Sequence, residues 1–360
     1  MFRPRRAAAG LSVPTLEGVA LDRRLRRQVA GRLESGSWVT PPARWCGRLW
    51  EALADPVRPC RLPSGACVIG VGGATLGGSG KTPVTGALAR ALADRGKRVA
   101  IVAKSYPVSP GPARRVLAED TFEQVGDEPV MLARALPDIP VVVGSRREGA
   151  LALAARLGDV LLLDGVLQVR PERLDLSILV LDERLPWGAG RCPPAGDLRA
   201  SRRRLLDAAD VVLIGPAASG TRPSLELARA GYRSDAELVA GRSASGDRWS
   251  PDALRSGRVG LALAIARPDR VARTLRQLGI HPVRVHRFGD HGRLPIPAVP
   301  LDAWLTSEKC ATKLPPRIGR APVLALEWRL KLPPELVELL ERQAALQMLS
   351  CRKTRGRVRP

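Results

Sequence analysis

The sequence Cys67-Val68-Ile69-Gly70-Val71-Gly72-Gly73-Ala74-Thr75-Leu76-Gly77-Gly78-Ser79-Gly80-Lys81-Thr82 decides the fold of this chain. An apolar run is followed by a glycine-rich stretch and then by the helix-like segment 84–93, which together predict a strand, a phosphate-binding loop and a helix. In such a loop, glycines allow backbone N–H groups to point at phosphate oxygens. Lys81 can neutralise the outer phosphates, and the hydroxyl of Thr82 can bind Mg²⁺.

The general phosphate-loop motif has glycine at the position of Thr75, so the match is one residue short. From the residues alone two interpretations are open: a nucleotide-binding loop, or a flexible turn between a strand and a helix. The residues that we assign to the candidate nucleotide-binding loop are Thr75, Leu76, Gly77, Gly78, Ser79, Gly80, Lys81 and Thr82.

Apolar segments that suit buried strands alternate with helical segments along the chain. This alternation predicts an α/β fold with a doubly wound, mainly parallel sheet of the P-loop NTPase type. A capping box is expected at Ser145 and Glu148, at the start of a helix that runs to Leu157. The expected strands are 67–71, 98–103, 139–143, 160–164, 177–182 and 211–214 in the first part, then 259–265, 283–287, 301–306 and 323–327; the other expected helices are 82–93, 268–278 and 334–349.

The pattern of strands and helices restarts after a segment rich in small residues at 217–223. We therefore expect four parts in the chain. They are a basic and aromatic segment at 1–60, a nucleotide-binding core at 61–220, a smaller α/β lobe at 221–350 and a basic, frayed tail at 351–360.

Lys and Arg (58) outnumber Asp and Glu (35), which gives the 360 residues a formal net charge of +23. Such a charge suits nucleic acid, an anionic membrane surface or a phosphorylated substrate, but the bias toward arginine, alanine, glycine and proline is also typical of GC-rich genomes. At 3% aromatic content, stacking platforms for single-stranded nucleic acid are not expected, so we predict no specific nucleic-acid partner. The six cysteines are scattered, which favours reduced thiols, a cytoplasmic setting and no zinc site.

A short aromatic stretch near the N-terminus has two possible roles. No apolar run of the chain approaches the ~18 residues that a membrane-spanning helix needs. Trp45, Leu49 and Leu53 share one face of an expected helix, with Trp50 beside them and Trp38 upstream. This face can lie in a membrane surface, or it can pack on the protein core.

Several acidic residues and histidines are candidates for chemistry. Asp164 ends an apolar strand downstream of the phosphate loop, where a carboxylate can bind Mg²⁺, and Asp182 is its competitor. Asp127 and Glu128 precede a helix, whose N-terminus they can simply stabilise. His291, next to Asp290, lies in a turn-rich segment and is a candidate general base.

These fragments, in this order, resemble the tetraacyldisaccharide 4'-kinase family, the lipid A 4'-kinases of Gram-negative bacteria. The similarity runs from about Arg44 to Leu330, and the family also has threonine at the position of Thr75. The motifs that carry the resemblance are the loop ending at Pro83, Val125-Gly126-Asp127-Glu128-Pro129, the segment 140–144, Asp164 with Leu167-Gln168, the segments 188–199 and 264–268, Phe288 with Asp290-His291, and Thr306 with Glu308-Lys309 and Lys313-Leu314.

The resemblance implies a kinase that transfers the γ-phosphate of ATP to the 4'-hydroxyl of a tetraacylated glucosamine disaccharide 1-phosphate, peripheral on the cytoplasmic face of the inner membrane. It implies that Asp127 and His291 form a catalytic pair while Lys81 and Mg²⁺ hold the triphosphate. Thr82 and Asp164 are the implied metal ligands. Glu128, Gln168 and Asp290 are further positions of the family's motifs.

The chain departs from the family at several motif positions. The family usually reads Asp-Asp-Gly-x-Gln-His where this chain reads Asp164-Gly165-Val166-Leu167-Gln168-Val169, and Lys104 and Cys310 replace the usual Arg and Asp. Three interpretations remain open at this point. They are an active kinase that uses Asp164 alone or with Asp182, a kinase with a changed acceptor, and a catalytically impaired paralogue that only binds nucleotide.

Overall fold

The structure is a computed structural model that describes residues 29, 32–33, 36–37, 39–55, 57–105, 108–171, 174–217, 231–288 and 296–356. Trp38, most of the expected boundary at 217–223, the pair Asp290 and His291, and the last four residues lie outside the described residues.

The described residues form helices and strands in alternation. The helices are α2 (Pro41–Leu53), α3 (Lys81–Ala93), α4 (Phe122–Val125), α5 (Asp127–Ala135), α6 (Arg147–Leu157), α7 (Arg202–Asp207), α8 (Pro251–Ser256), α9 (Pro268–Gln277), α10 (Glu308–Ala311) and α11 (Pro334–Gly356). The strands are β1 (Val57–Cys60), β2 (Cys67–Gly73), β3 (Val99–Val102), β4 (Arg114–Arg115), β5 (Val141–Val143), β6 (Val160–Asp164), β7 (Gln168–Pro171), β8 (Leu176–Leu181), β9 (Val211–Ala217), β10 (Gly231–Arg242), β11 (Arg248–Trp249), β12 (Val259–Leu263), β13 (Arg284–Arg287), β14 (Ala303–Ser307), β15 (Arg317–Ile318) and β16 (Ala321–Lys331).

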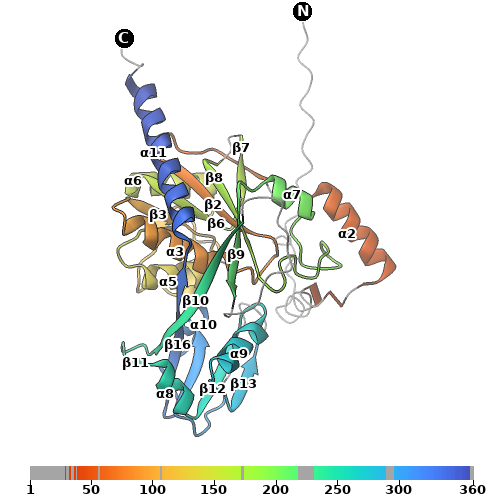
Figure 1. Cartoon of the computed structure of the whole chain (residues 1–360), viewed down its shortest axis with the longest axis vertical. Helices are drawn as coiled ribbons and strands as arrows, with labels where there is room; N and C mark the ends of the chain where they lie inside the picture. The colour runs from red at the N-terminus through yellow and green to blue at the C-terminus, as the bar shows by residue number, and fades with distance from the viewer. Residues whose placement is uncertain are drawn as a thin grey trace, which may run out of the picture.

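Within the part of the chain that the structure describes, one sheet of 14 strands joins both ends of the molecule, and its main path is β13-β12-β14-β16-β10-β9-β8-β2-β6-β3-β5-β4. The neighbours from β9 to β5 are all parallel. The long strands β10 and β16 pair antiparallel and extend between the middle of the molecule in Figure 1 and the region of α8, α9, β12 and β13. The expected doubly wound, mainly parallel α/β sheet is confirmed.

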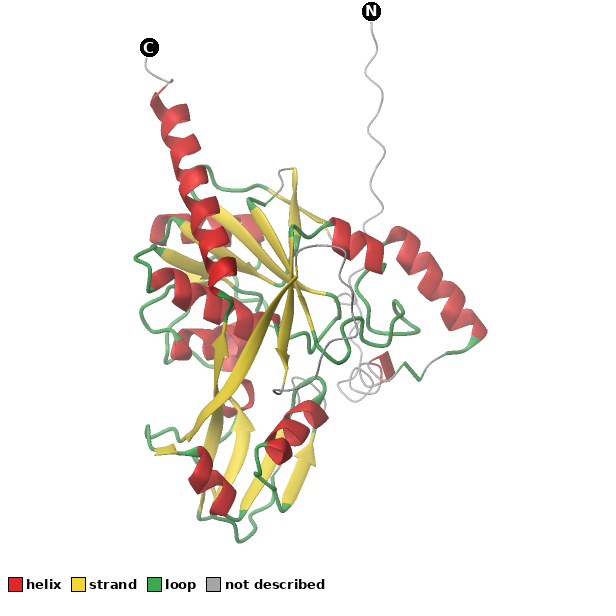
Figure 2. Ribbon diagram, in the orientation of Figure 1, coloured by secondary structure: helices red, strands yellow, loops and turns green. Residues whose placement is uncertain are grey.

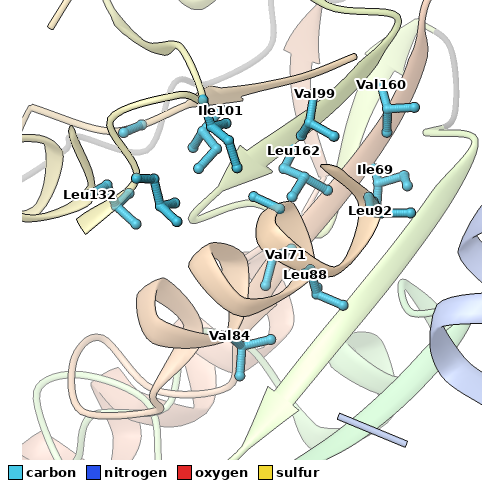
Figure 3. Packing of buried hydrophobic residues seen from close by; sticks show 14 of the residues in the cluster. Ile69, Val71, Val84, Leu88, Leu92, Val99, Ile101, Leu132, Val160 and Leu162 are labelled. Carbon is cyan, nitrogen blue, oxygen red and sulfur yellow. The ribbon is translucent and has the colours of Figure 1, made fainter. Parts of the chain in front are cut away.

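The core of the nucleotide-binding region lies on both faces of this sheet. On one face, Val84, Leu88 and Leu92 of α3 pack on apolar side chains of β2, β3 and β6, as Figure 3 shows, and α5 and α11 contribute to the same cluster. On the opposite face, α6 packs through Leu151 and its neighbours. Figure 2 shows helices on both sides of the fanned strands. Because β2 is buried along its whole length, the loop that follows it starts from a rigid base.

We call residues 251–318 the distal lobe. Its core is separate from that of the nucleotide-binding region, because α8 and α9 pack on β12, β14 and β16 through a cluster of their own. A second cluster around Trp304 covers the other face of these strands.

The structure corrects two details of the expected elements. The helix after β5 has Arg146 as its N-cap without a side-chain cap bond, so the capping box expected at Ser145 and Glu148 is wrong; the Ser145 hydroxyl instead shares a 2.8 Å hydrogen bond with the hydroxyl of Ser109. The C-terminal helix α11 continues to Gly356, so the first residues of the expected frayed tail are helical.

Candidate active site

The glycine-rich loop leads from β2 into the open N-terminus of α3. The N-cap is Gly80, which has φ 80° and ψ 10° and provides no side-chain cap. Glycine adopts this left-handed conformation without steric cost, and a Cβ there would meet nothing within 4 Å. The first N–H groups of α3 are thus left for an anion, which the helix dipole also favours.

The segment 197–199, which is distant in sequence, binds the loop through one side chain and one backbone carbonyl. The guanidinium of Arg199 donates to the carbonyl oxygens of Thr75, at 2.8 Å, and Leu76, at 3.2 Å. The N–H of Leu76 donates to the carbonyl of Asp197 at 2.8 Å, and the Thr75 hydroxyl donates to the carbonyl of Gly77 at 2.6 Å. The loop is therefore shaped before any ligand arrives, and the threonine that departs from the general motif takes part in that shape.

Asp164 lies at the end of β6, next to the start of α3. Its carboxylate accepts hydrogen bonds from the hydroxyls of Thr82, at 2.8 Å, and Thr85, at 3.3 Å. Burial raises the pKa of this carboxyl above its usual value; the charge of Lys81 lowers it and that of Glu128 raises it again. A buried carboxylate beside a threonine hydroxyl is a site where a cation would stabilise the charged form.

Asp182, the competing carboxylate, is already used by the protein. One oxygen accepts from the backbone N–H groups of Arg184 and Leu185, and the other forms a 2.6 Å ion pair with Arg270. Asp164 is thus the better candidate for a metal ligand.

Gly165, where the family usually has a second aspartate, adopts φ 92°. A Cβ at this position would lie 3.7 Å from Cε of Lys81, with space around it. The position faces the phosphate-binding lysine, but its backbone conformation suits glycine.

The donor set fits Mg²⁺, which takes oxygen ligands and usually keeps several waters together with one or two carboxylates and substrate phosphates. Thr82 and Asp164 provide a hydroxyl and a carboxylate within hydrogen-bond distance of each other. No group of three or more His, Cys, Asp or Glu side chains that could hold a metal occurs among the described residues. Phosphate oxygens and water would therefore have to complete a magnesium site.

Asp127 and Glu128, at the start of α5, are paired with two lysines of the distal lobe. Lys313 forms an ion pair with Asp127, and both side chains are almost completely buried. Lys309, which lies in α10 four residues earlier, is 3.4 Å from Glu128, and the ammonium of Lys313 also lies 5.9 Å from the centre of the Phe122 ring. These acids lie at the N-terminus of α5, as expected, and they also connect α5 to the distal lobe.

The structure gives fewer contacts for the remaining predicted residues. Gln168 starts β7, where its backbone pairs with Val57 of β1. His286 lies in β13, and its ring contacts that of Trp304 at 5.5 Å. The structure thus brings together Lys81, Thr82 and Asp164, with Glu128 in electrostatic range, while the candidate base His291 lies outside the described residues.

Two contributions were not foreseen from the residues. Arg199 and Lys313 appear in the motifs that carry the family resemblance, but neither was assigned a role. The contact of Arg199 with the loop joins positions 123 or more apart, and Asp127, the partner of Lys313, is still farther away along the chain. Only the folded chain identifies such partners.

The helix α2 presents its apolar face to the outside. The side chains of Trp45, Leu49 and Leu53 are exposed, whereas Trp50 packs toward the core and its indole N–H donates to the carbonyl of Arg199 at 3.1 Å. The interpretation that this stretch packs on the core is therefore wrong for Trp45, Leu49 and Leu53. In the described ranges, no helix has the length and apolar character that crossing a bilayer requires.

Comparison with known proteins agrees with this architecture. The model of the LpxK family, tetraacyldisaccharide-1-P 4'-kinase, matches residues 48–345. Tetraacyldisaccharide 4'-kinase of Methylobacterium sp. (strain 4-46) is 36% identical over 326 residues, which cover 86% of this chain and 90% of that protein. The enzyme of the same name from Anaeromyxobacter dehalogenans (strain 2CP-1) is 35% identical over 306 residues, 77% of this chain and 80% of that one.

A solved structure has the same fold. The crystal structure of the "apo" form of LpxK from Aquifex aeolicus, in complex with ATP, superposes with a TM-score of 0.64 at 24% identity, over 88% of this chain and 99% of that chain. Nothing in these comparisons supports an impaired paralogue. The chain belongs to the tetraacyldisaccharide-1-P 4'-kinase family, whose members are ATP-dependent kinases of lipid A biosynthesis.

Proposed function

We propose that this protein transfers the γ-phosphate of ATP to the 4'-hydroxyl of a tetraacylated glucosamine disaccharide 1-phosphate. The observation that carries the proposal is the hydrogen bond between Thr82 and Asp164 at the open N-terminus of α3, in a chain that belongs to this kinase family.

The loop and α3 bind the triphosphate in this proposal. Backbone N–H groups of the loop and the ammonium of Lys81 contact phosphate oxygens. Thr82 and Asp164 would hold Mg²⁺, which, when bound, neutralises charge on the phosphates during transfer. Because position 165 is glycine and not the second aspartate of the family, Asp164 would be the acidic metal ligand of this region.

Asp127, with His291, accepts the proton of the sugar hydroxyl in this proposal. The oxygen of that hydroxyl forms the new bond to the γ-phosphorus, the bond to the β–γ bridging oxygen breaks, and ADP leaves. In this structure the carboxylate of Asp127 is paired with Lys313. The acceptor hydroxyl would therefore have to reach Asp127 beside this pair, between α5 and the distal lobe.

The proposal also includes attachment to a membrane surface and a division of the chain into two lobes. The exposed apolar face of α2 carries Arg44 and Arg48 close by, a combination that suits the interface of an anionic bilayer. We therefore propose a peripheral location on the cytoplasmic face of the inner membrane, where an acylated acceptor is found. The cluster of the distal lobe, which is separate from the core, supports a second lobe beyond residue 220, although α11 and Tyr232 pack with the core cluster.

The test is ATP-dependent phosphorylation of the disaccharide 1-phosphate acceptor in detergent. The purified chain should form a bisphosphorylated lipid, and Lys81→Ala should abolish this product, because the lysine contributes directly to phosphate binding. An acceptor without the 4'-hydroxyl serves as the control. A folded protein that binds ATP but phosphorylates no such acceptor would overturn the proposal, and turnover of another lipid would indicate a changed acceptor.

A further inference from the structure

Arg267 has an unusual backbone conformation at the point where the distal lobe reaches the phosphate loop. Within the described ranges it is the only non-glycine residue with positive φ. It is the N-cap of α9, with φ 58° and ψ 55°. Residues other than glycine adopt this region rarely and at a cost, and such strain tends to occur at functional sites.

The side chain of Arg267 contacts the loop directly. A Cβ built on Gly78 would lie 3.2 Å from Cδ of Arg267 and 3.3 Å from Cβ of Ala266. These distances leave room for a glycine and little more. The methylenes of Arg267 thus cover the loop at the peptide that precedes Ser79 and Gly80.

The guanidinium of Arg267 is bound to Asp197, whose backbone carbonyl also accepts a hydrogen bond from the loop. It forms a 3.0 Å ion pair with Asp197, and the two side chains are 11% and 1% exposed. It also donates to the carbonyl of Leu185 at 3.4 Å. Asp197 in turn accepts the N–H of Ala189 with its other oxygen, at 2.8 Å, and the N–H of Leu76 with its carbonyl.

We infer that Arg267 is a positioning residue for the nucleotide site, which it reaches from the distal lobe. It encloses the loop between its methylenes at Gly78 and its ion pair with Asp197, and so sets the loop conformation that receives the phosphates. The inference rests on the proposed function for the identity of the ligand, a nucleoside triphosphate, but the geometry of the loop is independent of any turnover.

A neighbouring residue provides a matched control. Arg270, three positions on in α9, forms a 2.6 Å ion pair with the buried Asp182. This pair joins the same two regions as that of Arg267, and Asp182 is likewise bound by backbone N–H groups. The Arg270 pair therefore joins α9 to the segment that follows β8.

The experiment measures hydrogen–deuterium exchange of residues 74–80 in the ligand-free full-length protein, and ATP affinity by calorimetry. In Arg267→Gly we expect exchange of the loop to accelerate and the Kd for ATP to rise by roughly tenfold or more, although glycine removes the backbone strain. In steady-state assays the KM for ATP should rise more than kcat falls. Arg267→Lys, which keeps a cation and the methylenes, should recover part of the affinity.

Arg270→Met should leave both readouts within about twofold of the unmodified protein, because the ion pair of Arg270 is with Asp182 rather than with the loop-bound Asp197. If Arg267→Gly does not fold, Asp197→Asn removes the same ion pair without altering the backbone at 267, and it should also loosen the loop. Unchanged loop exchange and ATP affinity in a folded Arg267→Gly, or an equal effect of Arg270→Met, would overturn the inference. Loop exchange that responds as expected in a protein that binds no ATP would instead overturn the proposed function alone.

Discussion

The hydroxyl of Thr82 donates a 2.8 Å hydrogen bond to the carboxylate of Asp164, although the two residues are 82 positions apart. Parallel pairing of β2 with β6 places the ends of both strands at one edge of the sheet. The loop after β2 and the carboxylate at the end of β6 therefore meet at the N-terminus of α3. This pair is the centre of the candidate magnesium site.

Asp164→Asn should lower kcat by about 100-fold or more, because it removes the charge that a cation would bind. It should also raise the Mg²⁺ concentration at half-maximal rate. Mg²⁺ titrations of the phosphorylation rate measure both effects. Asp159→Asn, just before the same strand and paired with Arg98, is the matched control and should behave as the unmodified protein. An Asp164→Asn protein with a normal magnesium titration would exclude the carboxylate as a ligand.

Lys313→Met should destabilise the protein by about 3–5 kcal/mol, because it leaves the carboxylate of Asp127 buried without its cation. Urea unfolding followed by fluorescence gives the free energy of unfolding. The double variant Asp127→Asn with Lys313→Met should regain most of the loss. Lys309→Met, whose partner Glu128 is more exposed, should cost less. Additive losses in the double variant would contradict an ion pair between the two residues.

Gly165→Asp should lower the Mg²⁺ concentration that the reaction requires, because it adds a carboxylate beside Lys81. The positive φ of this position should at the same time reduce stability by about 1–2 kcal/mol. Gly246→Asp has a similar φ in open space and controls for strain. If the metal titration of Gly165→Asp does not change, the correspondence of Gly165 with the family's second aspartate is wrong.

Leu49→Glu should weaken binding to anionic vesicles, because it places a negative charge in the exposed apolar face of α2. Vesicle sedimentation measures the bound fraction. Leu117→Glu is the control, since the two leucines are 46% and 45% exposed and only Leu49 lies on α2. Equal binding by both variants would contradict attachment through α2.

Glu308→Gln should change how stability depends on pH. Burial raises the pKa of Glu308 from 4.5 to about 7, while Arg242 lowers it and Glu327 raises it. The folded chain therefore keeps a proton that the unfolded chain releases, and stability falls as the pH rises from 4.5 to about 7. The loss is on the order of 3 kcal/mol at most. Glu308→Gln should remove this decline in urea unfolding at pH 5 and 8, whereas Glu335→Gln, at the exposed start of α11, should retain it.

Local patterns predicted most of the elements. The apolar runs and the glycines around them placed β2, β6 and α3, because burial and turn formation depend on neighbours in sequence. The capping box at Ser145 failed because a local motif cannot account for a partner from another segment: the hydroxyl is engaged by Ser109. The end of α11 was missed because a basic composition does not by itself end a helix.

The strand, loop and helix of the phosphate site, and the motifs that the family shares, can be identified from the residues alone, because they depend on residues that are adjacent or in a fixed order. Which charged side chains form pairs depends instead on the folded chain. In the folded chain Lys313 pairs with Asp127, Asp182 pairs with Arg270, and Arg267 contacts the loop and pairs with Asp197. The physical reason is that a buried charge needs a partner in space, and the order of strands in the sheet, which no local pattern specifies, determines where that partner lies.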